Sequence, residues 1–321
     1  MYFERVTIVE KQSNRKWKEL FDSKSFCLEK MNVSKNARFY CIGSCFAEYV
    51  RTALENISAK KCLPDFETIA LDKRCEVVDT VSSGKYHMNY YSSASILQEF
   101  ERSLYDKELP PIKVANFQIR DGKRVQSIGN TAYQDPYRRE VYANSVLGIN
   151  NLSNRISRCV KAGLVEADCF IVTLGLVEIF RLEGSGLVFN QYPSYQGIGY
   201  FSENLKFYRQ TVSDVEQDLK KIINLIKSIN ESNKIIFSVS PVPLQATFTD
   251  SDVFSANVYS KSTLRSAVEH VVDRKSGIYY FPSYEMALNF GSDFFQSRDL
   301  RHANHRHVNF IMKTFFNSLS A

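Results

Sequence analysis

Residues 37–55 read ARFYCIGSCFAEYVRTALE: a short apolar run ends at a glycine, and a helical pattern follows directly. A continuous apolar run closed by a small residue is typical of a strand that is covered on both faces of a sheet. Two later runs share this character, DCFIVTLG at 168–175 and KIIFSVSPVP at 234–243. Together the three runs predict buried parallel strands.

Helical patterns precede or follow these runs. Residues 212–230 carry apolar side chains at helical spacing with charged residues between them, and residues 260–274 form a second such segment. The first predicts an amphipathic helix packed on the sheet through Val215, Leu219, Ile222, Ile223 and Ile226. Alternation of strands and helices predicts an α/β fold with a mainly parallel sheet.

Two segments interrupt this alternation, and we expect one domain over residues 1–321 with insertions at 104–145 and 182–203. In the first, an Asp-Gly pair between two short runs predicts a β-hairpin. The second is rich in Gly, Ser and aromatic residues. Long connections of this kind in compact domains often serve as lids or binding loops.

The composition favours an ordinary folded protein, with 44% hydrophobic residues and a net charge of +6. No basic run resembles a nucleic-acid-binding arm. The N-terminal residues are charged throughout and no apolar stretch is long enough to span a bilayer, so we expect a cytoplasmic protein. The seven cysteines show neither CxxC nor zinc-finger spacing, which predicts no metal or disulfide framework.

Ser44 and Cys45 occupy the turn after the first predicted strand. Ligands of open α/β sheets bind beyond the carboxyl ends of the strands. A cysteine at a helix N-terminus can become a thiolate nucleophile, whereas a serine there needs a neighbouring base. The alternative is that Ser44 only caps the helix and Cys45 is a small buried residue. The residues alone leave both open.

A base for this chemistry is expected near the C-terminus, where Asp299 and His302 are three residues apart. This spacing lets a carboxylate hold one imidazole nitrogen while the other accepts a proton from the nucleophile. Two alternatives are a solvated loop and a metal site built from His302, His305 and His307. No acidic or cysteine ligand set accompanies the three histidines, so we expect no metal and no cofactor.

Several blocks in order resemble the GSCFA-domain proteins, which are related to the SGNH (GDSL-like) hydrolases. The blocks are IGSCFAEYV, HMNYYSSASILQEF, TLGLVEIF, SPVPLQATF, YSKSTLRSAV, YFPSYEM and RDLRHAN. The resemblance implies a three-layer, flavodoxin-like α/β/α fold with a nucleophile after the first strand and an Asp-x-x-His pair. On this sequence these positions are Ser44 or Cys45, Asp299 and His302.

The sequence departs from the wider SGNH pattern in two places. A gapless overlay of Gly-Asp-Ser places Cys45, not Ser44, at the nucleophile position. The third SGNH block supplies an oxyanion-hole Asn, and Val177 stands there instead. We therefore predict an oxyanion hole near Gly175, with the missing donor supplied by Asn89 and by backbone N–H groups at Cys45 or Gly84.

Three further residues are candidates for substrate binding. Glu178 ends the second predicted strand, where a structural hydrogen bond is the competing interpretation. Lys261 and Arg265 are four residues apart, hence on one helical face, and suit a phosphate or carboxylate. A solvated charged face is an equal alternative for this pair.

These residues predict an enzyme that attacks an acyl carbonyl, either an ester hydrolase or an O-acyltransferase. The resemblance implies a carbohydrate-linked ester, such as one on a bacterial surface polysaccharide, as substrate. A coenzyme-A-type thioester is the expected donor if the acyl group is transferred, and no nucleic acid or membrane span is expected. The competing class is a catalytically silent sugar-binding or scaffold protein on the same fold.

Overall fold

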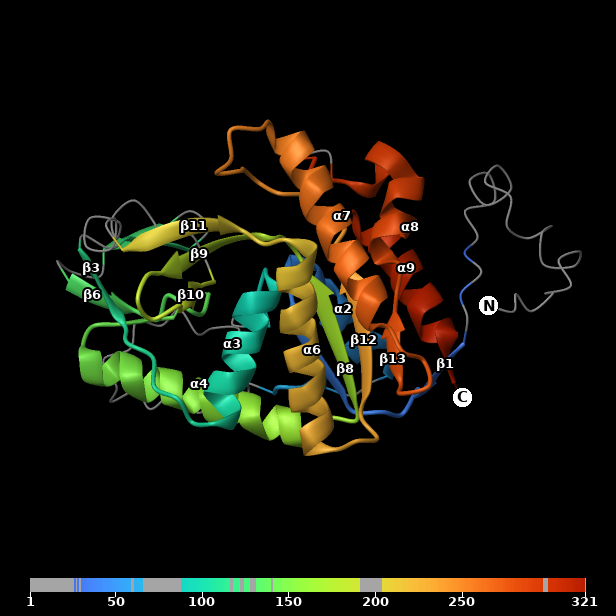
Figure 1. Cartoon of the computed structure of the whole chain (residues 1–321), viewed down its shortest axis with the longest axis horizontal. Coiled ribbons are helices and arrows are strands. Elements are labelled where there is room, and N and C mark those ends of the chain that lie inside the picture. The colour runs from blue at the N-terminus through green and yellow to red at the C-terminus, as the bar shows by residue number, and fades with distance from the viewer. Residues whose placement is uncertain are drawn as a thin grey trace, which may run out of the picture.

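A four-stranded parallel sheet lies at the centre of the computed structural model (Figure 1). Its strands are β2 (Phe39–Gly43), β8 (Cys169–Leu174), β12 (Lys234–Val239) and β13 (Ile278–Tyr280), in the order β13-β12-β8-β2. Beyond β2, Leu63 forms one further parallel bridge with Tyr40. This extra bridge gives the strand order of flavodoxin-like sheets. The structure describes residues 26, 28, 30–58, 61–65, 88–115, 118–121, 124–127, 131–139, 141–190, 204–296 and 300–320.

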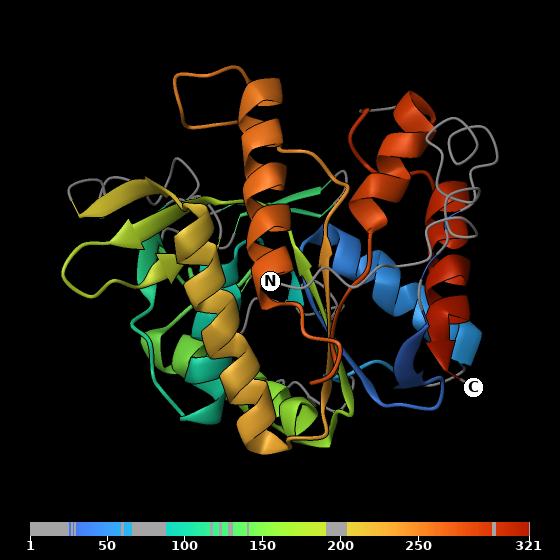
Figure 2. The ribbon, with the colours of Figure 1, turned by 45° about the vertical axis from the view of Figure 1, so that its right-hand side comes forward.

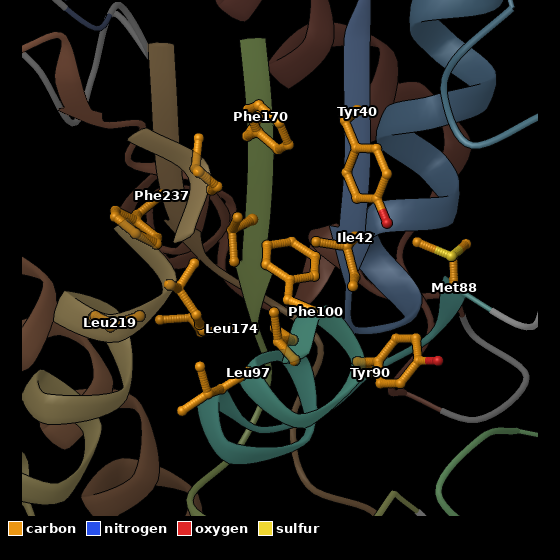
Figure 3. Packing of buried hydrophobic residues seen from close by; sticks show 14 of the residues in the cluster. Tyr40, Ile42, Met88, Tyr90, Leu97, Phe100, Phe170, Leu174, Leu219 and Phe237 are labelled. Carbon is orange, nitrogen blue, oxygen red and sulfur yellow. The ribbon is translucent and has the colours of Figure 1, made fainter. Parts of the chain in front are cut away.

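Alternate side chains of the strands enter two separate cores, because successive strand residues point to opposite faces. Tyr40 and Ile42 pack with Phe100 on one face, as Figure 3 shows. Phe39 and Cys41 belong to the core on the other face. The first core is covered by α3 (Ser93–Leu104), α4 (Val146–Glu166), α6 (Val212–Ile229) and α7 (Val253–Val271). The second is covered by α2 (Cys45–Ser58), α8 (Ser283–Phe290) and α9 (His305–Ser318).

The two sets of helices lie on opposite sides of the sheet (Figure 2), which makes a three-layer α/β/α arrangement. This confirms the fold class expected from the sequence. The amphipathic helix predicted at 212–230 is α6, and its four deepest residues are fully buried: Val215, Leu219, Ile222 and Ile226. It begins at a capping box in which Thr211 and Asp214 exchange hydrogen bonds.

Smaller antiparallel sheets lie beside α3 and α4 (Figure 1). One has the order β10-β9-β11, from β9 (Glu178–Leu182), β10 (Val188–Phe189) and β11 (Leu205–Arg209). Another has the order β3-β6-β7, from β3 (Ile112–Ala115), β6 (Thr131–Gln134) and β7 (Tyr142–Ala143). β4 (Gln118–Asp121) pairs antiparallel with β5 (Arg124–Ser127). Away from these sheets, β1 (Met31–Ser34) pairs in parallel with β14 (Leu319–Ser320). The 3₁₀ helix η4 (Gly291–Phe294) precedes the last loop.

The segments predicted as insertions supply most of these strands, although residues 191–203 and parts of 104–145 lie outside the described ranges. The division of the chain into one domain with two insertions therefore stays a prediction. In the described part of the chain, no helix combines the length and the apolar character needed to cross a membrane.

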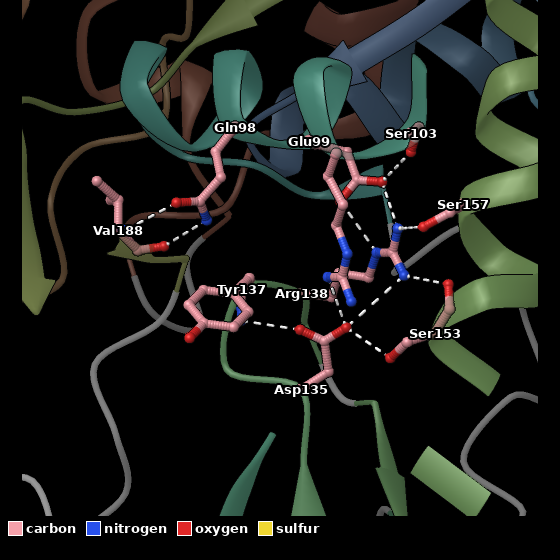
Figure 4. Close-up of polar contacts among 10 residues, drawn as sticks. Gln98, Glu99, Ser103, Asp135, Tyr137, Arg138, Ser153, Ser157 and Val188 are labelled. Carbon is pink, nitrogen blue, oxygen red and sulfur yellow. Dashed lines mark hydrogen bonds and ion pairs between the residues drawn. The ribbon is translucent and has the colours of Figure 1, made fainter. Parts of the chain in front are cut away.

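A buried network of charges joins the chain after β6 to helices α3 and α4 (Figure 4). Arg138 is fully buried and its Nε donates to Glu99 of α3 at 3.0 Å. Asp135 pairs with Arg102 at 2.7 Å and accepts a hydrogen bond from Ser153 of α4 at 2.7 Å. Burial alone would raise the pKa of Asp135, but Arg102 and Arg138 lower it below its ordinary value. The network therefore fixes the position of the chain around Arg138.

Candidate active site

A cavity of about 730 Å³ opens at the carboxyl ends of β2, β8 and β12. This is the edge of the sheet at which α/β proteins bind ligands. The residues after all three strands contribute to its wall. The described residues that line it are Ser44, Cys45, Tyr91, Ser92, Gly175, Leu176, Glu178, Phe180, Phe189, Asn190, Ser240, Val242, Pro243, Leu244, Gln245, Ala246, Phe248 and Arg301.

The turn that bears the two candidate nucleophiles depends on Gly43. Its φ is +140°, and a β-carbon at this position would lie 2.1 Å from the carbonyl oxygen of Thr173. The close approach allows the Ser44 N–H to donate to that oxygen at 3.0 Å. The chain therefore leaves β2, touches the neighbouring strand and enters α2 within two residues.

Ser44 and Cys45 have different surroundings. Ser44 is 4% exposed, and its Oγ lies 3.3 Å from Thr173 Oγ1 and accepts from the Phe46 N–H at 3.3 Å. This is the bonding of a helix cap. Cys45 is partly exposed at the first position of α2, and its Sγ lies 3.6 Å from the Tyr91 hydroxyl. The Ser44 hydroxyl is thus engaged in capping the helix, whereas the Cys45 thiol remains available to react with a ligand in the cavity.

Tyr91 is a site residue that the sequence did not single out. Its hydroxyl accepts from Arg139 Nη1 at 3.3 Å and contacts Cys45 Sγ. Burial raises the pKa of Tyr91, and proximity to Cys45 raises it further. Tyr91 is therefore a neutral phenol that can donate to a sulfur anion. Tyr91 falls within the block HMNYYSSASILQEF, but only the packing of residues 88–92 against β2 brings it to Cys45.

Asn89 lies beside the nucleophile turn. It forms a parallel bridge with Gly43, and the next residue, Tyr90, donates from its N–H to the Gly43 carbonyl at 2.7 Å. The Asn89 side chain is 1% exposed, and its Nδ2 has no hydrogen-bond partner among the described residues. Asn190 Nδ2 donates to the Asn89 carbonyl at 2.8 Å. The amide is thus held next to the turn, but Asn89 is not among the described residues that line the cavity.

Of the two glycines predicted for the oxyanion hole, the structure describes only Gly175. The Gly175 N–H already donates to the Tyr91 carbonyl at 3.0 Å, and the Leu176 N–H donates to the same oxygen at 2.9 Å. Gly175 thus lines the cavity, but its N–H is engaged within the protein. Gly84 lies outside the described residues. At the N-terminus of α2, no described residue accepts from the Cys45 N–H, so this backbone donor fits the hole best.

Lys261 and Arg265 do not come together as a substrate clamp. Lys261 is completely buried, and its Nζ donates to the carbonyls of Gly175 at 2.7 Å and Val242 at 2.8 Å. It therefore ties together the ends of β8 and β12. Burial, followed by repulsion from Arg301, lowers the pKa of Lys261 to about 7. Arg265 pairs with Glu269 and Glu285 and is not among the described residues that line the cavity.

Glu178 lines the cavity, but its carboxylate is occupied. Oε1 accepts from Thr247 Oγ1 at 2.6 Å and Oε2 accepts from the Phe248 N–H at 3.0 Å. These bonds hold the loop after β12 against the start of β9. This bonding matches the structural hydrogen-bond role that was the alternative to substrate binding for Glu178.

The loop predicted to carry the base is described only in part. Asp299 lies outside the described residues. His302 is partly exposed and is not among the described lining residues, whereas its neighbour Arg301 is. The Arg301 Nε donates to the Pro243 carbonyl at 3.2 Å, which joins this loop to the end of β12.

The other two C-terminal histidines pack on aromatic rings. His305 contacts the edge of Tyr49, and His307 lies 4.3 Å from the Phe290 ring, measured between centroids. Within the described ranges, no cluster of His, Cys, Asp and Glu side chains is arranged to hold a metal ion.

Comparison with known proteins places the chain in a family. Two solved structures are similar to it, a mutant acetyl esterase with acetate ion and a carbohydrate esterase of family 3 from Talaromyces cellulolyticus. Each matches at 12% identity with a TM-score of 0.27, over 48% of this chain and 61% of its own, so the match spans less than two thirds of either esterase. No curated protein matches the sequence. The sequence pattern of the GSCFA family matches residues 38–315, and the chain therefore belongs to the GSCFA family.

Proposed function

We propose that the protein is an acyl-transferring enzyme, an ester hydrolase or an O-acyltransferase, with Cys45 as nucleophile. The observation that carries the proposal is the contrast at one turn. Both residues line the large cavity, but the Cys45 thiol is partly exposed at a helix N-terminus, while the Ser44 hydroxyl is buried and engaged in capping. A helix N-terminus favours the thiolate, which is the reactive form of cysteine.

In the proposed reaction, His302 takes the thiol proton and the Cys45 sulfur attacks the acyl carbonyl carbon. The oxyanion that forms accepts hydrogen bonds from the Cys45 N–H and from Asn89. The ester C–O bond then breaks, and the leaving oxygen takes the proton from His302. Asp299 orients the imidazole.

Release of the acyl group follows the same path in reverse. Water or an acceptor hydroxyl attacks the thioester carbonyl, its proton passes to His302, and that proton returns to sulfur as the C–S bond breaks. Water gives hydrolysis and a sugar hydroxyl gives transfer. We propose a carbohydrate-linked ester as substrate, and a coenzyme-A-type thioester as donor when transfer occurs.

Intact-mass measurement tests the nucleophile. After brief incubation with p-nitrophenyl acetate, we expect one acetyl adduct on the wild-type protein and on Ser44→Ala, and none on Cys45→Ala. An adduct that persists in Cys45→Ala and disappears in Ser44→Ala would reassign the chemistry to serine. A wild-type protein that neither forms an adduct nor releases p-nitrophenol from the ester, with its fold intact, would be a silent scaffold and the proposal would fail.

The second prediction concerns the oxyanion hole. Asn89→Ala is expected to lower kcat by about 10²–10³-fold, the usual effect of removing one oxyanion donor, with a smaller change in KM. Steady-state hydrolysis of the same ester measures both constants. Asn151→Ala is the matched control, since Asn151 is exposed on α4. A kcat equal to that of the control, with the melting temperature of Asn89→Ala unchanged, would remove Asn89 from the hole.

A further inference from the structure

Aromatic rings form one wall of the cavity. Phe180 of β9 and Phe248 of the loop after β12 both line it, with ring centroids 4.8 Å apart and planes at 88°. Phe207 of β11 packs against both rings, with its centroid 5.6 Å from that of Phe180 and 6.2 Å from that of Phe248. The wall continues through lining residues that are also apolar: Phe189, Val242, Leu244 and Ala246. We call this set the aromatic wall.

The loop that carries Phe248 is held in place along its length. Lys261 binds the Val242 carbonyl, and Arg301 binds the Pro243 carbonyl. The Leu244 N–H donates to Asn257 Oδ1 at 3.1 Å, and Glu178 holds the Phe248 N–H. A ring fixed in this way nevertheless remains 48% exposed. Exposing apolar surface is unfavourable, and an exposed apolar patch inside a cavity is typical of a binding site.

The polar groups at this wall favour an apolar occupant. Both carboxylate oxygens of Glu178 already accept hydrogen bonds from the loop. The side chains of the aromatic wall themselves carry no hydrogen-bonding group, and a hydroxyl buried against them without a partner is costly. An apolar group needs no such partner. The cavity volume lies within the range of about 300–1,000 Å³ typical of drug-sized ligands, far more than an acetyl group fills.

We propose that the aromatic wall is an acyl-binding subsite, so that the group carried to Cys45 is an apolar acyl chain of several carbons and not acetyl. This inference rests on the proposed function for the chemistry at Cys45. Its physical content, an apolar subsite within reach of the thiol, can be measured without turnover.

Alkylation of Cys45 provides the test. Iodoacetamide and N-hexyl iodoacetamide react with a thiolate in the same way, since sulfur bonds to the methylene carbon and iodide leaves. Intact mass and peptide mapping give each rate at Cys45, and free cysteine corrects for intrinsic reactivity. We expect the hexyl reagent to react at least about tenfold faster with the wild-type protein, since each buried CH₂ contributes roughly a factor of three to four.

The variant Phe248→Ala removes an exposed side chain and should reduce this preference to nearly that of free cysteine. The matched control is Phe254→Ala on α7, which is 82% exposed and not a lining residue, and should keep the wild-type preference. No preference in the wild-type protein, or one that persists in Phe248→Ala, would overturn the subsite. Protection of Cys45 by a methyl glycoside without a hexyl preference would identify a sugar platform instead. If Cys45 prefers the hexyl reagent but the ester gives neither an acyl adduct nor p-nitrophenol, the apolar subsite stands and the acyl-transfer function is refuted.

Discussion

Replacing Arg138 by methionine is expected to lower the free energy of unfolding by about 3–5 kcal/mol. The guanidinium is fully buried among Glu99, Asp135 and Ser157, and its Nη2 donates to the Ser157 hydroxyl at 2.8 Å. Methionine has a similar length but no charge. It would leave the Glu99 carboxylate buried without its cation, and a buried unpaired charge is among the most destabilising changes in a protein.

Urea denaturation followed by circular dichroism measures the loss. The control is Arg158→Met on α4, where the arginine is exposed and the change should cost less than about 0.5 kcal/mol. Equal stabilities for the two variants would show that the network contributes nothing net. Because Arg139 follows Arg138 and contacts Tyr91, we also expect Arg138→Met to disturb the site at temperatures where the fold is still intact.

Alanine at Gly43 is the second change with a large expected effect, a loss of more than about 4 kcal/mol or failure to fold. The new methyl group would overlap the Thr173 carbonyl, which belongs to the backbone of the central strand β8 and cannot move aside. The positive φ adds strain of its own.

Gly184→Ala separates the two contributions. Gly184 also has a positive φ, +80°, but no atom lies within 4 Å of a β-carbon built there. We expect this control to cost only about 1–3 kcal/mol, the backbone strain alone. Thermal unfolding of both variants gives the comparison. If Gly43→Ala melts no lower than Gly184→Ala, then the contact with β8 is not what requires glycine.

The sequence predicts the layers well because their signals are local. The run around Ile42 and the spacing of Val215, Leu219 and Ile222 depend on neighbours a few residues away, and each element has the predicted type. The turn at Gly43 was predictable for the same reason, since a strand, a glycine and a helix follow one another directly.

The rest of the site depends on contacts between distant parts of the chain. Tyr91, Arg139 and Phe248 meet the strand ends through tertiary packing. Tyr91 and Phe248 fall within blocks of the family resemblance, but the blocks do not reveal these contacts. Helical spacing correctly put Lys261 and Arg265 on neighbouring turns of one helix. It could not predict that Lys261 would be completely buried with its Nζ on the Gly175 carbonyl, while Arg265 remains partly exposed and pairs with Glu269.

The buried ammonium of Lys261 has one more consequence, which concerns proton balance. With a pKa of about 7, it is close to half-protonated at neutral pH, and a negative charge on Cys45 raises that pKa. A negative charge on the sulfur therefore favours the protonated form of Lys261, and loss of that charge favours the neutral amine. In the proposed reaction, the charge of Lys261 would change in the opposite sense to the charge on sulfur. The sum of the two charges would then vary less over the reaction than the charge on sulfur alone.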